Sequence, residues 1–188
     1  MSIQQRRERE RAERERLIVT AARELAESEG WDAVTTRRLA AEIEYSQPVL
    51  YSHFTGKDAI MAAVAVEGFA DLAAELHAAR TSETGARQAL AAVGRAYCAF
   101  AERRPALYDA MFTLTVDLPF ATPEAPPALW KAFGELLETV RPLAGDDDPE
   151  MLTETLWSGL HGLLTLMRNG RLRREHHEGR LALLLSRI

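Results

Sequence analysis

Apolar residues recur every three or four positions along most of the chain, which is the spacing of amphipathic helices. One stripe begins at Leu17 and continues to Ala26, and Gly30 supplies a helix end. Four of the eight prolines fall within residues 117–127, which are therefore predicted to form a loop. The pattern predicts an all-α chain of about nine helices, over 17–30, two short helices within 35–57, 57–79, 86–103, about 107–112, 128–141, 150–168 and 174–188.

The two short helices are separated by only a few residues. Thr35 is suited to cap the first, which is predicted to bury Leu39, Ala40 and Ile43. The second is predicted to begin at Ser46, with Gln47 and Pro48 in its first turn and with Leu50 and Phe54 pointing inward. Its remaining side chains then form an exposed face with an amide, apolar surface and a phenol, made of Gln47, Pro48, Val49, Tyr51 and Ser52.

Such a face suits the reading of a base edge, and two helices joined this tightly match the helix-turn-helix, whose second helix enters the DNA major groove. The run TTRRLAAEIEYSQPVLYSHFTGK, residues 35–57, resembles the DNA-binding domain of TetR-type transcriptional repressors. The family pattern has threonine before the first helix, then L-A, then L-Y-x-H-F and a lysine. The matching residues are Thr35, Leu39, Ala40, Leu50, Tyr51, His53, Phe54 and Lys57.

Two positions depart from the family pattern. Glu44 stands in the turn where the family usually has glycine, and Val49 stands where the family often has a threonine that can bond a phosphate. A non-glycine residue at positive φ costs about 1 kcal/mol. Because these two departures can change the bend of the turn and the contacts of the second helix, the operator sequence does not follow from the resemblance.

The resemblance implies DNA contacts at Thr35, Thr36, Arg37, Gln47, Pro48, Val49, Tyr51, His53 and Lys57. Arg37, Gln47, Pro48 and Tyr51 are expected to contribute to base reading. Arg37 and Gln47 have the planar, multi-donor ends that suit base edges. Thr35, His53 and Lys57 are expected to hold phosphates. Lys57 stands at the start of the next helix, where backbone N–H groups also favour a phosphate. The alternative for His53 is packing against the next helix.

The chain has a net charge of −5, and residues 1–57 hold ten basic and ten acidic side chains, so the net negative charge lies after Lys57. This balance argues against a wholly basic nucleic-acid coat protein but permits local DNA binding. Cys98 is the single cysteine, which excludes an intrachain disulfide and a multi-thiolate metal site. No run approaches the roughly 18 apolar residues of a membrane span. A cytoplasmic protein with no membrane partner is expected.

Residues 2–16 alternate arginine and glutamate with almost nothing to bury. One interpretation is a solvated helix extension or frayed arm, because interleaved glutamates cancel the field of the arginines. The other is an N-terminal arm whose arginines reach phosphates or a minor groove.

The predicted organisation is an arm and three-helix DNA-binding domain over 1–57 and a larger ligand-binding and dimerisation domain over 58–188. The helix that starts at Lys57 joins them. Trp157 to Gly162 resembles the W…HG signature of one class of TetR ligand-binding domain. Gly159 and Gly162 are expected to let another helix approach closely.

A small, largely apolar effector is predicted to bind in the second domain, although aromatic residues at helical spacing are also ordinary core. His161 would be its polar anchor, or would instead find a partner within the protein. The candidate pocket residues are Phe69, Tyr97, Phe100, Tyr108, Met111, Phe112, Phe133, Trp157 and His161.

The last two helices are predicted to form a four-helix bundle between two subunits, because useful affinity requires two reading helices about 34 Å apart on a palindrome. The predicted interface residues are Leu156, Leu160, Leu163, Leu181, Leu184, Leu185 and Ile188. The run GDDDPE before residue 151 offers a metal-site hypothesis. The alternative is a helix start, with Asp148 as the N-cap before Pro149.

Three functions compete for this sequence: a ligand-responsive, homodimeric DNA-binding repressor, an enzyme, and a helical adaptor that binds only protein. The enzyme lacks support, since there is no glycine-rich phosphate loop, no metal-spaced His/Cys set and no nucleophile elbow around Ser158. The adaptor leaves Gln47, Tyr51, His53 and Lys57 unexplained on one surface. The repressor is the preferred hypothesis, without catalytic residues, metal or cofactor.

Overall fold

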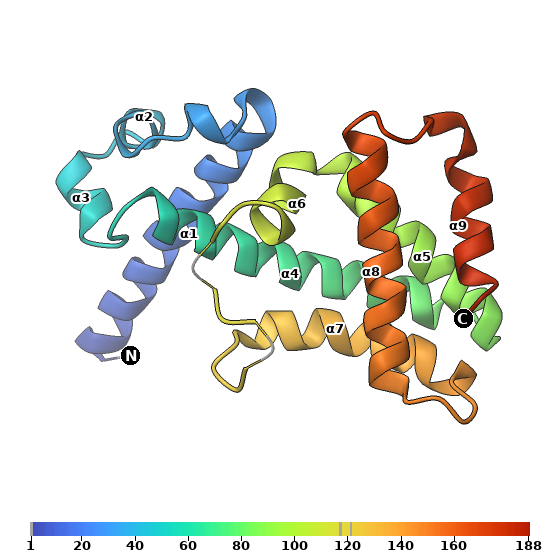
Figure 1. Ribbon diagram of the computed structural model, residues 1–188. Helices are drawn as coiled ribbons and strands as arrows, with labels where there is room; N and C mark the ends of the chain where they lie inside the picture. Colours follow the sequence, from blue (N-terminus) through green and yellow to red (C-terminus); the bar gives the residue numbers. More distant parts are fainter. Residues whose placement is uncertain (1, 117, 121) are drawn as a thin grey trace. The chain divides into compact units, whose positions relative to one another are not determined.

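The computed structural model describes residues 2–116, 118–120 and 122–188, and within them it contains nine α-helices and no strand. The predicted all-α class is confirmed. Figure 1 shows the helices in chain order. Their bounds are α1 Ile3–Glu29, α2 Thr36–Glu42, α3 Gln47–Tyr51, α4 Lys57–Thr81, α5 Ala86–Arg103, α6 Pro105–Phe112, α7 Pro127–Val140, α8 Pro149–Arg168 and α9 His177–Leu185. Three 3₁₀ turns complete the fold, at Trp31–Ala33, Arg141–Leu143 and Arg174–His176.

The chain divides by packing into two compact units. Unit 1 comprises Met1–Gly68 and Arg104–Pro126, and unit 2 comprises Phe69–Arg103 and Pro127–Ile188. α4 supplies residues to both units. These units are defined by packing, and the functional division after residue 57 stays a prediction.

Unit 1 gathers α1, α2, α3, the first half of α4, and α6. The Glu27 carboxylate on α1 accepts hydrogen bonds from the backbone N–H groups of Ala106, at 3.1 Å, and Leu107, at 2.9 Å. The first N–H groups of a helix have no partner within it, so Glu27 caps α6. The Trp31 indole N–H donates to the Ala106 carbonyl at 2.8 Å, and the Trp31 ring is buried.

α4 and α6 approach closely at Gly68. A Cβ at this position would lie 2.6 Å from Sδ of Met111 and 2.8 Å from Cδ1 of Leu107. These distances are below van der Waals contact, so a side chain at Gly68 would push α6 away from α4. α6 therefore belongs to the core of unit 1, although about fifty residues separate it from α3 along the chain.

Unit 2 is a helical bundle in which α5 packs against α7, α8 and α9. Figure 1 shows α8 and α9 antiparallel and side by side. The second half of α4 is tied to α7 because Glu135 accepts a hydrogen bond from Nε of Arg80 at 2.9 Å and lies 3.0 Å from Nδ1 of His77. Gly159 permits the close approach of α8 and α9: a Cβ there would lie 2.8 Å from Leu184 Cδ1.

Most predicted helix bounds agree with the structure to within a few residues. α1 begins at Ile3, so residues 3–16 form the solvated helix extension that one interpretation of this run expected. Ile43 and Phe54 are half-buried, not part of the interior as predicted, because both lie at the ends of short helices where the chain turns outward. A Cβ at Gly162 would meet nothing within 4 Å, so the close approach expected there does not occur within this chain.

Candidate functional site

The two helices of the motif are held by caps at both ends of α2. Thr35 is its N-cap, and the Thr35 hydroxyl accepts a hydrogen bond from the Arg38 N–H at 3.2 Å. At the other end Glu44 has a φ of 57°. Glu44 N–H donates to the Ala41 carbonyl at 3.3 Å, and Tyr45 N–H donates to the Ala40 carbonyl at 2.8 Å. This pair of bonds is a Schellman motif, which normally carries glycine at the left-handed position.

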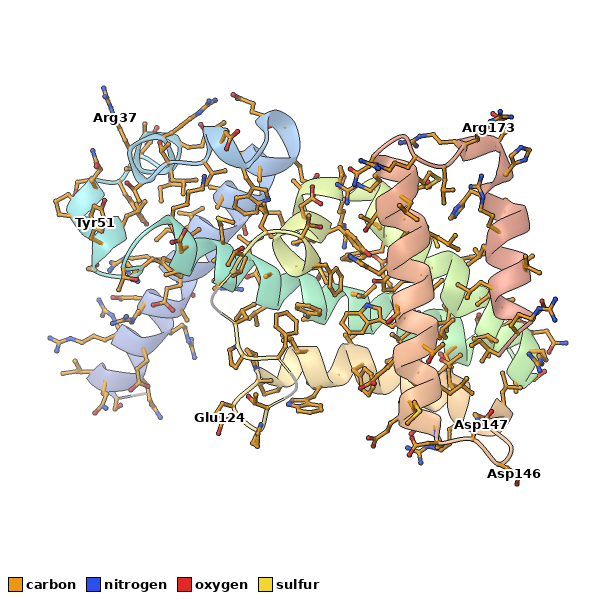
Figure 2. The ribbon with its side chains drawn as sticks, viewed as in Figure 1. Arg37, Tyr51, Glu124, Asp146, Asp147 and Arg173 are labelled. Carbon is orange, nitrogen blue, oxygen red and sulfur yellow. The ribbon has the colours of Figure 1, made fainter. Side chains whose placement is uncertain are left out.

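α3 begins directly after this turn, with Pro48 in its first turn as predicted. Leu50 is buried and anchors the helix to the core of unit 1. Gln47 and Pro48 are exposed, Val49 is half-buried, and 52% of Tyr51 is exposed. We call the exposed side chains of Arg37, Gln47, Pro48 and Tyr51 the reading face. Figure 2 shows Arg37 and Tyr51 directed away from the body of unit 1.

The reading face joins both helices of the motif. The Tyr51 hydroxyl lies 3.3 Å from the Thr36 hydroxyl, which connects α3 to the first turn of α2. Arg37 has no hydrogen bond or ion pair within the described part of the chain, whereas both terminal nitrogens of its neighbour Arg38 bind the Glu29 carboxylate. Arg37 is consequently available to a partner, and Arg38 is engaged in holding α2 to α1.

Two of the predicted phosphate-binding residues already contact the protein. The His53 side chain is only 6% exposed, and its Nδ1 lies 3.3 Å from Oε1 of Glu15 on α1. The Lys57 ammonium donates to the Trp31 carbonyl at 2.5 Å and keeps two further N–H donors. Burial alone would raise the pKa of Glu15, but hydrogen bonds from Arg11 and His53 lower it overall.

The candidate effector residues fall into both units. Tyr108, Met111 and Phe112 belong to unit 1, where the Tyr108 and Phe112 rings pack with centroids 4.8 Å apart. The others belong to unit 2, where Phe69, Tyr97 and Phe100 are buried and Phe133, Trp157 and His161 are half-buried.

In unit 2 the polar groups of the candidate pocket bind one another. The Trp157 indole N–H donates to the Tyr97 hydroxyl at 3.0 Å, which links α8 to α5. Nε2 of His161 lies 3.3 Å from the Thr165 hydroxyl, one turn further along α8. Burial lowers the pKa of His161, and the charge of Arg168 lowers it further. His161 thus has Thr165 as one partner within the protein, and its role as an effector anchor stays a prediction.

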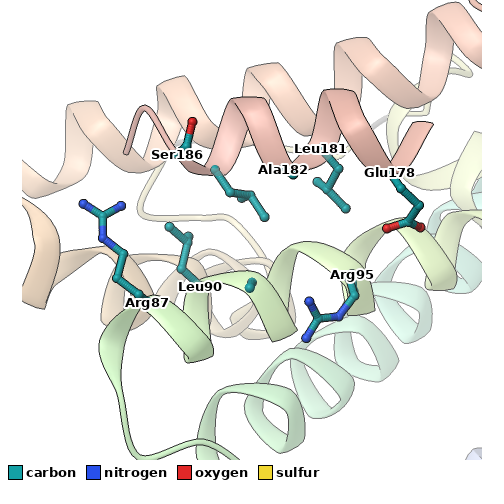
Figure 3. A pocket seen from close by; sticks show the side chains of 9 residues that line it. Arg87, Leu90, Arg95, Glu178, Leu181, Ala182 and Ser186 are labelled. Atoms are coloured by element: carbon teal, nitrogen blue, oxygen red, sulfur yellow. The ribbon is translucent and has the colours of Figure 1, made fainter. Parts of the chain in front are cut away.

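A groove between α5 and α9 was not predicted from the sequence. It has a volume of about 430 Å³, and its floor includes Leu90, Leu181 and Leu185. Figure 3 shows Arg87, Arg95 and Glu178 around this apolar floor. An apolar floor whose edge carries two guanidinium groups and one carboxylate suits a small amphipathic ligand. No local signal could have identified the groove, because its walls come from helices about ninety residues apart.

The predicted interface leucines separate into two groups. Leu156, Leu160, Leu181 and Leu185 are buried inside unit 2, where they hold the bundle together. Leu163, Leu184 and Ile188 are half-buried. The large apolar side chains that α8 and α9 expose are Met151, Leu166 and Leu183.

The aspartates of GDDDPE form a helix start. The Asp148 side chain accepts hydrogen bonds from the N–H groups of Glu150, at 2.8 Å, and Met151, at 3.1 Å, with Pro149 in the first turn of α8. The cap prediction is confirmed. Within residues 2–116, 118–120 and 122–188, no group of three His, Cys, Asp or Glu side chains is arranged to hold a metal ion. In the same residues, no helix is long and apolar enough to cross a membrane.

The geometry of α2 and α3 is that of a helix-turn-helix regulator of transcription. Two family models match the chain: "Bacterial regulatory proteins, tetR family" over residues 18–64 and "Tetracyclin repressor-like, C-terminal domain" over residues 90–187. The chain belongs to the TetR family, and it is a transcriptional regulator rather than an enzyme. The narrower W…HG class stays a prediction.

Individual relatives agree with this assignment. The HTH-type transcriptional regulator YobS of Bacillus subtilis is 33% identical over 96 residues, which are 51% of this chain and 50% of YobS. The class D tetracycline repressor protein of Escherichia coli is 44% identical over 50 residues, 27% of this chain and 23% of the repressor. The chain thus matches half or less of these relatives. A solved structure of a protein of unknown function from Rhodococcus sp. RHA1 has a TM-score of 0.76 and 26% identity, covering 92% of this chain and 91% of that one.

Proposed function

We propose that this regulator is a homodimeric, cytoplasmic repressor that binds a palindromic DNA operator and is released by a small, largely apolar effector. The observation that carries the proposal is the reading face. Arg37, Gln47, Pro48 and Tyr51 stand exposed on a helix pair that buries Leu39, Ala40 and Leu50 in the core of unit 1. Exposed planar donors on a helix of this kind suit the base edges of a major groove.

The roles divide between base reading and positioning. Arg37 and Gln47 would bond guanine and adenine edges, while Val49 and Pro48 would contact apolar base atoms such as a thymine methyl. Thr35 and Thr36 lie at the start of α2 and Lys57 at the start of α4, where backbone N–H groups favour anions. The His53 side chain is only 6% exposed and meets the Glu15 carboxylate, so its proposed role is to hold α1 beside the end of α3.

The experiment is binding of fluorescent duplexes from the DNA beside the protein's own gene, compared with a random duplex of equal length. Wild-type protein is expected to prefer one palindromic segment. Gln47→Ala should relax the preference at one or two base pairs per half-site, and Lys57→Ala should weaken all sequences alike. If the wild type prefers no segment of that DNA, the repressor proposal fails and the adaptor is favoured.

Dimerisation is proposed through the outer faces of α8 and α9. One helix-turn-helix contacts few base pairs, so a palindrome needs two copies about 34 Å apart. Leu166 is 43% exposed and Leu183 is 58% exposed, and both would be covered by the same faces of a second subunit. The half-buried Leu163, Leu184 and Ile188 would line the edge of that contact.

Sedimentation of Leu166→Glu and Leu183→Glu tests this interface. Each places a charge on the outer face, so each is expected to shift the protein toward monomer without unfolding it. Leu184→Glu is less discriminating, because the Leu184 methyl groups pack on Gly159 within the chain. A variant carrying both outer changes that remains fully dimeric would place the interface elsewhere.

Effector release is proposed to act through α4. This helix is fixed to α6 around Gly68 and to α7 through Arg80 and Glu135, so a change in the packing of unit 2 is passed along one continuous helix. An effector can act only as far as it prefers the released state. A hundredfold loss of operator affinity requires a preference of about 2.7 kcal/mol.

His161 is the proposed polar anchor of the effector. A thermal-shift panel of small apolar compounds carrying one hydroxyl or carboxyl group would identify ligands, and each would then be tested for release of DNA. His161→Phe is expected to keep DNA binding and lose release, with Arg87→Gln as the matched change in the α5–α9 groove. If His161→Phe responds normally and Arg87→Gln does not, the effector occupies the groove.

A further inference from the structure

The first turns of α1 extend beyond the part of the chain that matches the family's DNA-binding domain. The match begins at residue 18, whereas α1 begins at Ile3. The extension is a well-formed helix: Ser2 and Gln5 make a reciprocal capping box. Ion pairs at i, i+4 support it, with Arg6 Nε 2.9 Å from Glu10 and Arg11 Nε 2.9 Å from Glu15.

The extension is positively charged in a chain that is negative overall. Residues 2–16 contain six arginines and four glutamates, a net charge of +2, whereas the whole chain carries −5. Two of the four glutamates, Glu10 and Glu15, are paired with Arg6 and Arg11. Arg7, Arg9, Arg14 and Arg16 are exposed and have no ion pair within the described residues.

The helical period sorts these arginines onto two faces. Arg7, Arg11 and Arg14 are spaced i, i+4 and i+7, and the same spacing continues through Ile18 and Leu25, which are buried in unit 1. We call Arg7, Arg11 and Arg14 the arginine stripe. Arg9 and Arg16 lie about 200° around the helix from Arg7, on the opposite face. From residue 18 onward this face of α1 packs in the core of unit 1. Before residue 18 the same face carries the arginine stripe.

The inner end of the stripe lies at the level along α1 where this helix meets the end of α3. Glu15 follows Arg14 directly and its carboxylate meets His53, two residues after the last residue of α3. At about 1.5 Å of rise per residue, Arg7 is roughly 12 Å further along the helix axis. The stripe thus continues outward from the edge of the helix pair that carries the reading face.

We propose that the arginine stripe binds the phosphate backbone of the operator duplex, and that Arg7 and Arg14 contribute most because neither forms a close ion pair within the described residues, whereas Arg11 is paired with Glu15. This inference rests on the proposed DNA-binding function. The partner is a polyanion because the stripe presents three cations, and duplex DNA is the polyanion that the reading face brings to this edge. The contact is to phosphates rather than bases, so it strengthens binding without specifying sequence.

The test compares two double variants with the same change of charge in the same helix. Arg7→Gln with Arg14→Gln removes two members of the stripe, and Arg9→Gln with Arg16→Gln removes the opposite pair. Glutamine keeps a good helix propensity, and circular dichroism would verify equal helicity. The binding constant is measured by fluorescence anisotropy at several salt concentrations, on the operator duplex and on a random duplex of equal length.

The stripe variant is expected to bind both duplexes more weakly, by the same factor, and to lower the salt slope. A dimer loses four phosphate contacts, so the slope of log K against log salt should fall by about 3.6 in magnitude. The opposite-face variant should retain the wild-type slope. Equal losses in both variants, or no loss in either, would overturn the proposal while leaving the repressor function intact. A wild type that binds neither duplex would overturn both.

Discussion

The candidate DNA-reading side chains of unit 1 are exposed on two short helices, whereas the candidate effector residues of unit 2 mostly lie between long ones. Arg37 and Tyr51 project away from the protein, while Tyr97 and Phe100 have almost no accessible surface. A surface for a large, rigid partner can be built from neighbouring residues of one segment. A site for a small molecule needs walls from several helices, so most of its candidate residues also belong to the core.

The largest expected effect separates leucines that hold unit 2 together from leucines proposed to join subunits. Leu156 is fully buried in α8, so Leu156→Ala should lower the free energy of unfolding by about 2–5 kcal/mol. Leu183→Ala, on the exposed face of α9, should change the unfolding of a monomeric variant by no more than about 0.5 kcal/mol. Urea denaturation in the Leu166→Glu background measures both. Equal losses of unfolding free energy in the two variants would mean that Leu183 is packed in the folded subunit rather than exposed.

The next effect sharpens the description of the reading face. Arg37→Ala should cost about 1–3 kcal/mol of operator binding and leave the free energy of unfolding unchanged. Arg38→Ala is the matched control one residue away, since Arg38 is engaged with Glu29. It should weaken operator binding less and lower stability only slightly, because the ion pair with Glu29 is exposed to solvent. Anisotropy and urea denaturation on the same preparations provide both values, and a reversed order would contradict the assignment of Arg37.

A smaller effect tests the turn of the motif. Glu44 occupies a left-handed conformation, so Glu44→Gly should relieve strain of about 1–2 kcal/mol, partly offset by the greater entropy of glycine in the unfolded chain. We expect a net gain of a few tenths to about 1 kcal/mol. Ala41→Gly, on the exposed side of α2, should instead cost about 1 kcal/mol. Thermal unfolding distinguishes the two, and a loss of stability in Glu44→Gly would show that its side chain contributes to the turn.

The smallest effect concerns acid sensitivity in unit 2. The folded-state pKa of His161 lies below the ordinary value of 6.5, so the unfolded chain binds more protons as pH falls through that value. The contribution of neutral His161 to the free energy of unfolding is therefore fully present above pH 6.5 and is lost as the pH falls below that value. His161→Gln should reduce the fall in stability between pH 7 and pH 5, followed by urea denaturation at each pH. An unchanged pH profile would mean that His161 is solvated in the folded protein.

The helix-turn-helix could be predicted almost entirely from the sequence. The Thr35 cap, the buried Leu39 and Leu50, the strained turn at Glu44 and the exposed Tyr51 are all features of one 23-residue segment. Caps, turn conformations and helical faces depend on neighbours within about four residues. The Asp148 cap of α8 was predictable for the same reason. The two mispredicted core positions, Ile43 and Phe54, lie where a short helix ends and its period no longer applies.

The remaining features depended on contacts between distant segments. Periodicity shows that Leu156 and Leu160 face an apolar surface, but it does not show whether that surface belongs to the same chain or to another subunit. The place of α6 in unit 1 depends on Glu27, Trp31 and Gly68, each far from α6 in sequence. The α5–α9 groove likewise arises from two helices at opposite ends of unit 2.

The arginines of α1 show where this boundary lies. Their spacing and net charge are properties of the sequence, and the heptad-like continuity from Arg7 to Leu25 can be counted along it. Whether that face meets solvent or a partner depends on where the domain ends, and the contact between Glu15 and His53 places this end at α3. The sequence alone determined the helices and the chemistry of their faces, because both arise from interactions within a few residues. Only the tertiary structure decided what each face meets, because burial depends on which distant helices pack together.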